Sequence, residues 1–294
     1  MGGAAEAWLA TLPATIADLA QGWGLRLGAT LEGGSSAYVA EAVTAAGAAA
    51  VLKITMPGDE PVESEIRALA LADGHGYARL LAADPARRAL LVERLGAPLA
   101  DLGWPRERAL EALAATLMAS WRPLPHADGL LSLPDKAAWL ARFIPQTWEA
   151  LRRPCRAAVV ERAVAYAEQR GRVHDPAKAV LLHGDPHIHN ALADPHEPGR
   201  FRLIDPDGIW GEPAYDIGAL LRGGSEALLA GDPATLGRAR CARMAALTGQ
   251  PEDAIWAWAF VERVSTALYA WKLGAADDGR RMLEVAEAWT AAAA

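Results

Sequence analysis

Two patterns of hydrophobic and polar positions divide the chain into a strand-rich part and a helical part. Between residues 24 and 56, short apolar runs alternate with glycine-containing turns, which is typical of antiparallel strands. One amphipathic helix is expected from about Asp59 to Leu71, followed by strand-like runs at Ala78–Ala83 and Ala89–Glu93. The first part of the chain is therefore predicted to be a small sheet with one helix.

After Pro98 the apolar positions recur at helical spacing instead. The predicted helices are Arg106–Trp121, Pro134–Phe143, Pro154–Gln169, Pro233–Leu247 and Glu252–Leu273. Asp232 before Pro233 favours the start of the fourth of these helices, because the pair supplies a cap and a suitable first residue. With a boundary between Gly96 and Pro98, we expect an α+β fold of two lobes, residues 1–97 and residues 98–294.

Composition narrows the class of protein. A chain of 294 residues can bury a sizeable core, and a net charge of −7 argues against a nucleic-acid partner. Cys155 and Cys241 lie far apart, without disulfide or zinc spacing, which favours a reducing cytoplasm. No apolar run is long enough to span a bilayer, and the N-terminus lacks the basic start of a signal peptide. We expect a cytoplasmic monomer or weak dimer.

A first acidic cluster follows the apolar run Val180–Leu182. Asp185 stands between Gly184 and Pro186, in a tight loop that can hold its carboxylate in one orientation. A general base must lie within hydrogen-bond reach of the proton that it accepts, so such a loop suits one. Asn190, five residues later, supplies a neutral oxygen suited to Mg²⁺. The alternative is a polar turn with a capped aspartate.

A second acidic cluster lies close enough in sequence to form a paired-strand unit with the first. Leu203 and Ile204 lead to Asp205, and a Pro-Asp-Gly turn follows. Magnesium usually takes one or two carboxylates, with substrate phosphates and water completing its ligands, and Asn190 and Asp205 fit that demand. Taken alone, Pro-Asp-Gly also fits a simple hairpin turn. Together the clusters suit magnesium-assisted phosphoryl transfer.

One lysine interrupts an apolar strand pattern in the first part of the chain. Lys53 lies in the run Ala48–Thr55, where its charge is costly to place unless it has a partner. ATP phosphates are such a partner, and an acid from the next helix can fix the side chain. Glu65 is the first choice for this acid and Glu63 the second. The alternative is an edge-strand lysine that opposes aggregation.

The two clusters together carry a family resemblance. The motif His183-Gly-Asp185-x-His187-x-x-Asn190, followed by Ile204-Asp205 and Gly211-x-Pro213-x-x-Asp216, resembles the aminoglycoside phosphotransferase family. Within that family it is most similar to the group of streptomycin 6-phosphotransferases and hydroxyurea phosphotransferases. The resemblance implies a bilobal, protein-kinase-like fold, with a small antiparallel sheet and a larger, mostly helical lobe. It implies a transfer from ATP with Mg²⁺ to a hydroxyl of a small-molecule antibiotic, giving resistance.

The resemblance also implies residue roles. Asp185 is then the catalytic base, Asn190 and Asp205 hold magnesium, and Asp216 braces the catalytic loop. Lys53, paired with Glu65, holds the ATP phosphates and acts in catalysis. The backbone of Glu93 and Leu95 is expected to bind the adenine edge. The Gly33-Gly34-Ser35 turn is a candidate loop over the phosphates, because backbone N–H groups there can face an anion.

The acceptor site is the least determined part of the sequence. Asp207, Trp210 and Glu212 lie beside the metal motif, and Glu262 lies on a late helix that is rich in tryptophan. They are candidates for an acidic and aromatic pocket for a cationic aminoglycoside, with streptomycin at its 6-hydroxyl as the favoured acceptor. In the alternative interpretation, the tryptophans are core residues and Glu262 is a solvated helix charge.

Other classes of function remain open. Hydroxyurea or another small metabolite is an alternative acceptor. Imidazole and carboxylate groups at alternating positions, here His183, Asp185, His187 and His189, can bind zinc in a metal-dependent hydrolase. Against this, Pro186 breaks the two-residue period of a strand, and only His196 follows as a further histidine. A degenerate, kinase-like binding protein is the non-catalytic alternative.

Overall fold

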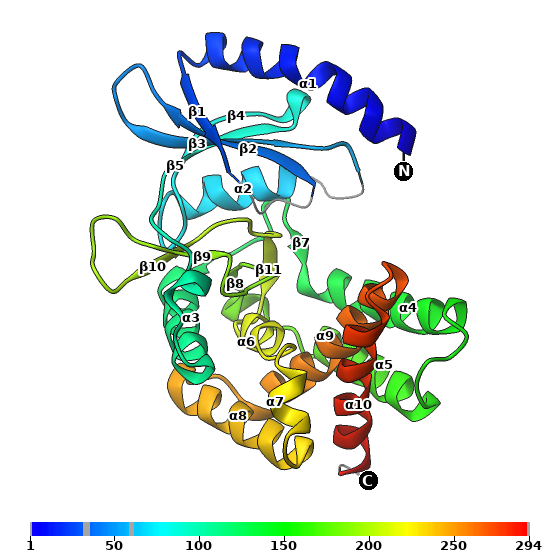
Figure 1. The fold of residues 1–294 in the computed structure, drawn as a ribbon. Helices are drawn as coiled ribbons and strands as arrows, with labels where there is room; N and C mark the ends of the chain where they lie inside the picture. Colours follow the sequence, from blue (N-terminus) through cyan, green and yellow to red (C-terminus); the bar gives the residue numbers. More distant parts are fainter. Residues whose placement is uncertain (1, 32–35, 59–61, 293–294) are drawn as a thin grey trace.

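The computed structural model describes residues 2–31, 36–58 and 62–292, and Figure 1 displays their arrangement. The smaller lobe contains a five-stranded antiparallel sheet with the order β1-β2-β3-β5-β4. Its strands are β1 (Arg26–Thr30), β2 (Ala37–Val43), β3 (Ala49–Thr55), β4 (Leu80–Asp84) and β5 (Ala89–Glu93). The predicted strand-rich part is therefore confirmed.

The two faces of the sheet pack against different helices. Ala50, Leu52 and Ile54 of β3 are buried on the face covered by helix α1 (Gly2–Gly22). Successive strand residues point to opposite faces, so Lys53 points to the other side, where helix α2 (Val62–Ala72) lies. In Figure 1, α2 lies between the sheet and the helical lobe, while α1 lies on the far side. Strand alternation thus directs Lys53 toward the larger lobe.

Helix α1 was not predicted from the sequence. It contributes Trp8, Leu12, Ile16 and Leu19 to the apolar cluster on the outer face of the sheet. These side chains recur at helical spacing, but alanines surround them and Pro13 interrupts the pattern. The smaller lobe therefore contains helix α1 in addition to the predicted helix α2. The first residues predicted for α2, 59–61, lie outside the described residues.

The larger lobe is mostly helical, as expected. Its helices are α3 (Arg106–Ser120), α4 (Leu133–Ala150), α5 (Ala157–Arg172), α6 (Ala214–Leu220), α7 (Ser225–Leu229), α8 (Pro233–Thr248), α9 (Glu252–Lys272) and α10 (Ala276–Ala291). Short 3-10 helices are Leu99–Leu102 and Pro176–Lys178, and in the smaller lobe Pro85–Arg87. The five predicted helices are confirmed with shifted ends, whereas α6, α7 and α10 were not predicted. Within the described ranges, we find no helix of the length and apolar character that a bilayer span requires.

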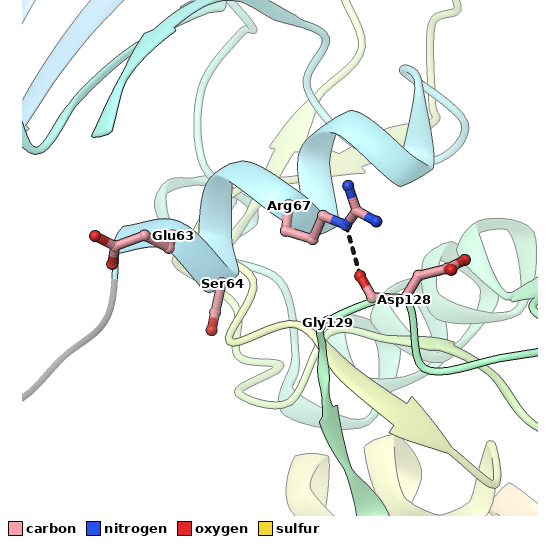
Figure 2. Close-up of a pocket in the computed structure, with 5 residues that line it drawn as sticks. All are labelled: Glu63, Ser64, Arg67, Asp128 and Gly129. Atoms are coloured by element: carbon pink, nitrogen blue, oxygen red, sulfur yellow. Dashed lines mark hydrogen bonds between the residues drawn. The ribbon is translucent and has the colours of Figure 1, made fainter. Parts of the chain in front are cut away.

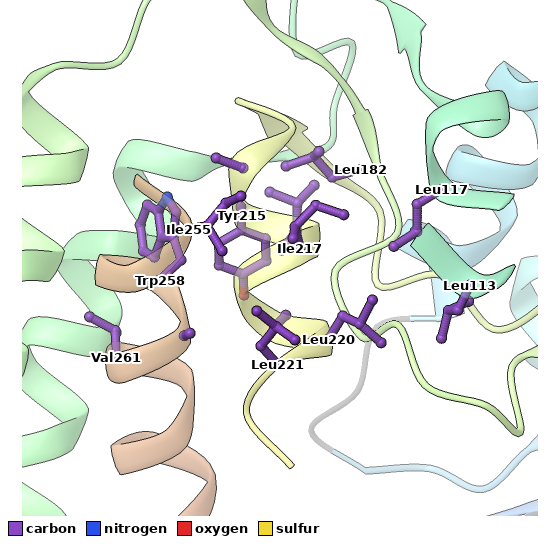
Figure 3. Packing of buried hydrophobic residues seen from close by; sticks show 14 of the residues in the cluster. Leu113, Leu117, Leu182, Tyr215, Ile217, Leu220, Leu221, Ile255, Trp258 and Val261 are labelled. Atoms are coloured by element: carbon purple, nitrogen blue, oxygen red, sulfur yellow. The ribbon is translucent and has the colours of Figure 1, made fainter. Parts of the chain in front are cut away.

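Helix α9 forms the centre of this lobe and positions α6 (Figure 3). Trp258 of α9 is fully buried and packs edge-on against Tyr215 of α6, with ring centroids 5.0 Å apart. A Cβ added at Gly218 of α6 would lie 2.4 Å from the Cβ of Trp258, so only glycine permits this close approach. Because Asp216 lies on the same helix turn, this packing fixes its position as well.

Short strands carry the motif residues between these helices. A four-stranded sheet has the order β6-β8-β11-β7, from β6 (Arg122–Pro123), β7 (Leu131–Ser132), β8 (Val180–Leu182) and β11 (Ile209–Gly211). A separate hairpin pairs β9 (Ala191–Ala193) with β10 (Phe201–Leu203), with Ala191 opposite Leu203. The expected paired-strand unit is thus present between the two acidic clusters.

Backbone contacts join the two lobes near the predicted boundary. The N–H of Gly96 donates to the carbonyl of Ala193 over 2.8 Å, and that of Ala78 donates to Leu203 over 2.8 Å. The small sheet and the helical lobe confirm the predicted fold class, whereas the division at residues 97 and 98 stays a prediction.

Candidate functional site

Lys53 joins acids from both lobes. Its Nζ lies 3.0 and 2.8 Å from the two carboxylate oxygens of Glu65, and 2.5 Å from Oδ1 of Asp205, which follows β10. Of the two acids proposed as its partner, Glu65 faces Lys53, whereas Glu63 lines a separate pocket. The strand lysine and the second acidic cluster, 152 residues apart, therefore meet.

Burial and charge act in opposite directions in this cluster. Burial lowers the pKa of Lys53, but the carboxylates of Glu65 and Asp205 outweigh it and raise that pKa above its usual value. Burial also raises the pKa of Glu65 to about 8, although Lys53 opposes the shift and the charge of Asp205 adds to it. Lys53 is thus held as a cation between two acids, where an anionic ligand would meet a fixed positive charge.

Asn190 and Asp205 lie side by side at the ends of the β9–β10 hairpin. The N–H of Ile204, next to Asp205, donates to the carbonyl oxygen of Asn190 over 3.0 Å. Asp205 has a left-handed backbone, with φ of 56°, which is unusual for a residue other than glycine. The amide nitrogen of Asn190 donates to the backbone carbonyl of Asp185 over 3.3 Å, which leaves the amide oxygen as the candidate metal ligand.

This donor set fits a magnesium ion. Asn190 and Asp205 offer a neutral and an anionic oxygen, and Mg²⁺ usually takes few protein ligands and completes its shell with phosphates and water. Among the residues that the structure describes, no group of three or more His, Cys, Asp and Glu side chains is arranged to hold a metal ion.

The loop that carries Asp185 is held by Asp216. The buried carboxylate of Asp216 accepts the backbone N–H groups of His183 and Gly184, each over 3.0 Å, and the indole N–H of Trp121 over 3.2 Å. Gly184 has φ of 92°, and a Cβ there would lie 2.6 Å from the Cβ of Asp207. Asp216 therefore braces the loop, as the resemblance implied.

His183 has a structural part in the same loop. Its Nδ1 accepts the N–H of Asp185 over 3.2 Å, so the tautomer with a proton on Nε2 donates to the carbonyl of Ile204 over 2.8 Å. Both ring nitrogens are engaged within the protein. His183 is therefore not available as a zinc ligand in this arrangement, which removes one member of the proposed hydrolase site.

An arginine that the sequence analysis did not identify contacts Asp185. Arg222, just after α6, donates through Nη2 to Oδ1 of Asp185, while Nε2 of His187 lies 3.6 Å from Oδ2. Burial raises the pKa of Asp185, but the charges of Arg222 and His187 outweigh it and lower that pKa overall. Burial lowers the pKa of His187, although the carboxylate of Asp185 opposes that shift. The Asp185 carboxylate is thus ionised.

The proposed acceptor residues occupy different environments. Asp207 donates its N–H to the carbonyl of His183, and water reaches its side chain. Surrounding protein atoms still desolvate it and raise its pKa to about 6, with Lys136 opposing and Asp185 adding to the shift. Trp210 donates from its indole to the carbonyl of Leu124 over 2.9 Å. Of this pair, Asp207 lies beside the Asp185 loop.

The two proposed acceptor glutamates are engaged within the protein. Glu212 accepts a bidentate contact from Arg170 of α5 and the indole N–H of Trp258 over 2.7 Å. Glu262 is buried, with 7% of its surface exposed, and accepts the hydroxyl of Tyr215 over 2.7 Å. Glu262 is therefore not a solvated helix charge, and Glu212 ties α5 to α9.

The groups proposed to contact the nucleotide are the backbone of Glu93 and Leu95 and the turn at residues 33–35. The N–H of Glu93 donates to the carbonyl of Arg79 over 2.9 Å, so this N–H is already engaged within the protein. The Glu93 side chain accepts from Arg202, and Leu95 is buried. Gly33, Gly34 and Ser35 lie outside the described residues.

An open pocket of about 580 Å³ lies between α2 and the turn that precedes β7 (Figure 2). It is lined by Glu63, Ser64, Arg67, Asp128 and Gly129, and the guanidinium of Arg67 donates to the carbonyl of Asp128 over 2.6 Å. This pocket does not contain the Lys53 cluster. It marks another place where the first lobe contacts the second.

The small antiparallel sheet and the mostly helical larger lobe form a kinase-like fold. The structure of choline kinase LicA from Streptococcus pneumoniae superposes with a TM-score of 0.61 at 13% identity, covering 96% of this chain and 99% of that chain. More specifically, the chain belongs to the aminoglycoside/hydroxyurea antibiotic resistance kinase family, whose model matches residues 23–274.

Two relatives illustrate the range within this family. Streptomycin 6-kinase from Streptomyces glaucescens is 32% identical over 213 residues, which cover 72% of this chain. Hydroxyurea phosphotransferase from Kitasatospora aureofaciens is 34% identical over 226 residues, which cover 74% of this chain. The alignments span 67% and 62% of the length of these relatives.

Proposed function

We propose that the protein is an ATP- and Mg²⁺-dependent O-phosphotransferase that acts on a hydroxyl of a small-molecule antibiotic. The observation that supports this most is the contact of Lys53 with Glu65 in its own lobe and with Asp205 in the other. Asn190 lies beside Asp205, and its amide contacts the Asp185 loop. A lysine for the phosphates, an acid that holds it, ligands for the metal ion and a base for the acceptor hydroxyl are the groups that phosphoryl transfer from ATP requires.

In this proposal Lys53 binds the phosphates of ATP, and Glu65 holds the ammonium group in place. Asn190 and Asp205 would hold Mg²⁺, which neutralises charge on the phosphates. Asp185 orients the acceptor hydroxyl and accepts its proton, while the hydroxyl oxygen bonds to the terminal phosphorus and the bond to ADP breaks. Positioning and electrostatic stabilisation supply most of the rate in such transfers.

The preferred acceptor is an aminoglycoside, with streptomycin at its 6-hydroxyl as the first candidate. The streptomycin 6-kinase relative supports this choice, and the half-exposed carboxylates of Asp185 and Asp207 would attract a cationic acceptor. Hydroxyurea is the second candidate, since a hydroxyurea phosphotransferase is 34% identical. Phosphorylation of either compound in the cytoplasm, where ATP is available, would give resistance.

ADP release from Mg·ATP, measured with streptomycin, hydroxyurea and other aminoglycosides in turn, tests the function. We expect release with one of these acceptors and a product whose phosphate position NMR assigns. Asp185→Asn should lower kcat by about 10²–10⁴-fold, because the proton acceptor is lost. Asp175→Asn, which changes an exposed cap of a 3-10 helix, is the matched control. Wild-type turnover in Asp185→Asn would show that Asp185 is not the base.

Nucleotide titrations test the other roles separately. Asp205→Ala should lose binding of Mg·ATP, and Lys53→Ala should slow transfer. An unchanged titration of Asp205→Ala would contradict the metal role, and wild-type turnover of Lys53→Ala would contradict the role of Lys53 on the ATP phosphates. Stoichiometric zinc in the purified protein, without ATP consumption, would favour the hydrolase instead.

A further inference from the structure

Arg222 lies beside the candidate catalytic base, and both terminal nitrogens of its guanidinium contact protein oxygens. It follows α6 six residues after Asp216, and 18% of its side chain is exposed. Its Nη1 donates to the carbonyl of Ala219 over 3.1 Å, while its Nη2 contacts Oδ1 of Asp185. One end of the guanidinium is thus fixed to its own helix and the other faces the catalytic loop.

A second arginine holds the backbone on both sides of Arg222. Arg263 of α9 is fully buried, and its Nη2 donates to the carbonyls of Leu221 over 3.1 Å and Gly223 over 3.3 Å. Its Nη1 donates to the hydroxyl of Ser225 over 2.9 Å. Burying a guanidinium against carbonyl and hydroxyl oxygens is costly. The hydrogen bonds of Arg263 offset this cost and fix the backbone conformation on both sides of Arg222.

Helix α3 restrains the same segment from the other side. Gly224 has φ of 75°, and a Cβ at this position would lie 2.4 Å from the guanidinium carbon of Arg106. Arg106 therefore packs directly on the glycine two residues after Arg222. Arg106 of α3 and Arg263 of α9 thus both contact this segment, so the backbone that carries Arg222 is fixed.

The contact with Arg222 distinguishes the two oxygens of Asp185. Oδ1 is held by the guanidinium, whereas Oδ2 lies 3.6 Å from Nε2 of His187, and 41% of the Asp185 side chain is exposed. A carboxylate that is free to rotate would present either oxygen in many orientations. Fixing one oxygen restricts the orientation of the other, and because the side chain is 41% exposed, an acceptor hydroxyl can reach it.

We propose that Arg222 is a positioning residue, which holds one oxygen of Asp185 so that the other accepts the proton of the acceptor hydroxyl. The inference rests on the proposed function. Arg263 acts one step further away, since it fixes the backbone that carries Arg222. The competing interpretation is that the Arg222–Asp185 pair only ties α6 to the catalytic loop and contributes to stability.

Steady-state kinetics of Arg222→Ala, with both substrates varied, separates the two interpretations. We expect kcat to fall on the order of 10²-fold, because misplacing a reacting group by about 1 Å has that effect. The KM for ATP should stay within about twofold of the wild-type value, since Arg222 does not touch the Lys53 cluster. Added guanidinium ion should restore part of kcat, and Arg222→Lys should retain more activity than the alanine variant.

Arg240→Ala is the matched control. Its side chain is 17% exposed and pairs with Glu107 over 3.4 Å, so it loses a similar ion pair outside the site. Equal kcat in Arg222→Ala and wild type would overturn the inference, as would a loss of kcat that neither guanidinium nor lysine relieves. Wild-type protein that transfers phosphate to none of the acceptors would instead overturn the proposed function, and the inference with it.

Discussion

Carboxylates that accept backbone N–H groups occur at two contrasting places in the molecule. Asp216 is fully buried and accepts from His183 and Gly184, while Asp232 caps α8 at the surface and accepts from Ala234 and Thr235. The geometry is similar, but water can replace the carboxylate only at the exposed position. The energetic value of the two groups should therefore differ.

Asp216→Ala should destabilise the protein on the order of 3 kcal/mol, because buried N–H donors lose their acceptor. Asp232→Ala should cost about 1 kcal/mol, the usual value for a helix cap. Chemical denaturation of both variants measures the difference. Equal losses would show that burial does not set the value of this carboxylate.

The two cysteines should be poor nucleophiles in the folded protein. Burial raises the pKa of the Cys241 thiol to about 12 and that of Cys155 to about 11. Since the thiolate is the reactive form, a thiol reagent at pH 8 should react about 100-fold more slowly than with a free cysteine. Denaturant should make both thiols react quickly. Rapid labelling of the native protein would contradict the burial of these groups.

Residue contacts were predictable only where a motif fixes them. Glu65 could be preferred over Glu63 because the lysine, the helix and their order along the chain limit the choice. Arg222 gave no such signal, because an arginine after a helix has many roles and its partner lies 37 residues away. The engagement of Glu212 by Arg170 likewise depends on how α5 packs, which no local pattern specifies.

At the scale of elements, α1 completes the smaller lobe. Without it, Leu52 and Ile54 of the sheet would face water, although the catalytic motifs would be unchanged. The helix buries Leu19, which is 3% exposed, and presents Leu9, which is 56% exposed. Substitutions of these two leucines can therefore be compared to test whether α1 packs against the sheet.

Leu19→Ala should cost about 2 kcal/mol or more, because it removes buried methyl groups and leaves a cavity. Leu9→Ala should change stability by less than about 0.5 kcal/mol, since its side chain is already exposed. The midpoint of urea unfolding, compared for the two variants, is the measurement. Similar midpoints would mean that α1 does not pack on the sheet in solution.

Strong local signals identified most other elements. Asp232 and Pro233 mark the start of α8, and the apolar run of β3 stands out around Lys53. Helices α6 and α10 escaped prediction because their apolar residues mix with glycine and charged residues. The short α6 is defined by its packing against Trp258, a contact between segments far apart in sequence.

At the scale of the whole molecule, several contacts connect the two lobes, and two of them lie on either side of the proposed nucleotide position. The Gly96–Ala193 hydrogen bond joins them at one side, and the Lys53–Asp205 pair crosses between them. A nucleotide that binds between the lobes would therefore stabilise both. Its effect should appear in the unfolding of the entire chain.

Mg·ATP at about 100 times its Kd should stabilise the fold by about 2.7 kcal/mol. For a chain of 294 residues, that corresponds to a rise in Tm of about 4 °C. Thermal unfolding with and without the nucleotide measures the rise, and Lys53→Ala should reduce it. An unchanged Tm with wild-type protein would count against nucleotide binding at this place.

The ammonium group of Lys53, held between Glu65 and Asp205, has a thermodynamic consequence for ligand entry. A triphosphate that arrives alone takes the lysine and strands the Asp205 anion, while a divalent cation that arrives alone competes with the lysine for that same anion. Arriving together, they exchange partners and leave every charge matched. Each should therefore tighten the binding of the other, by a coupling of about 1–3 kcal/mol that must be equal in both directions.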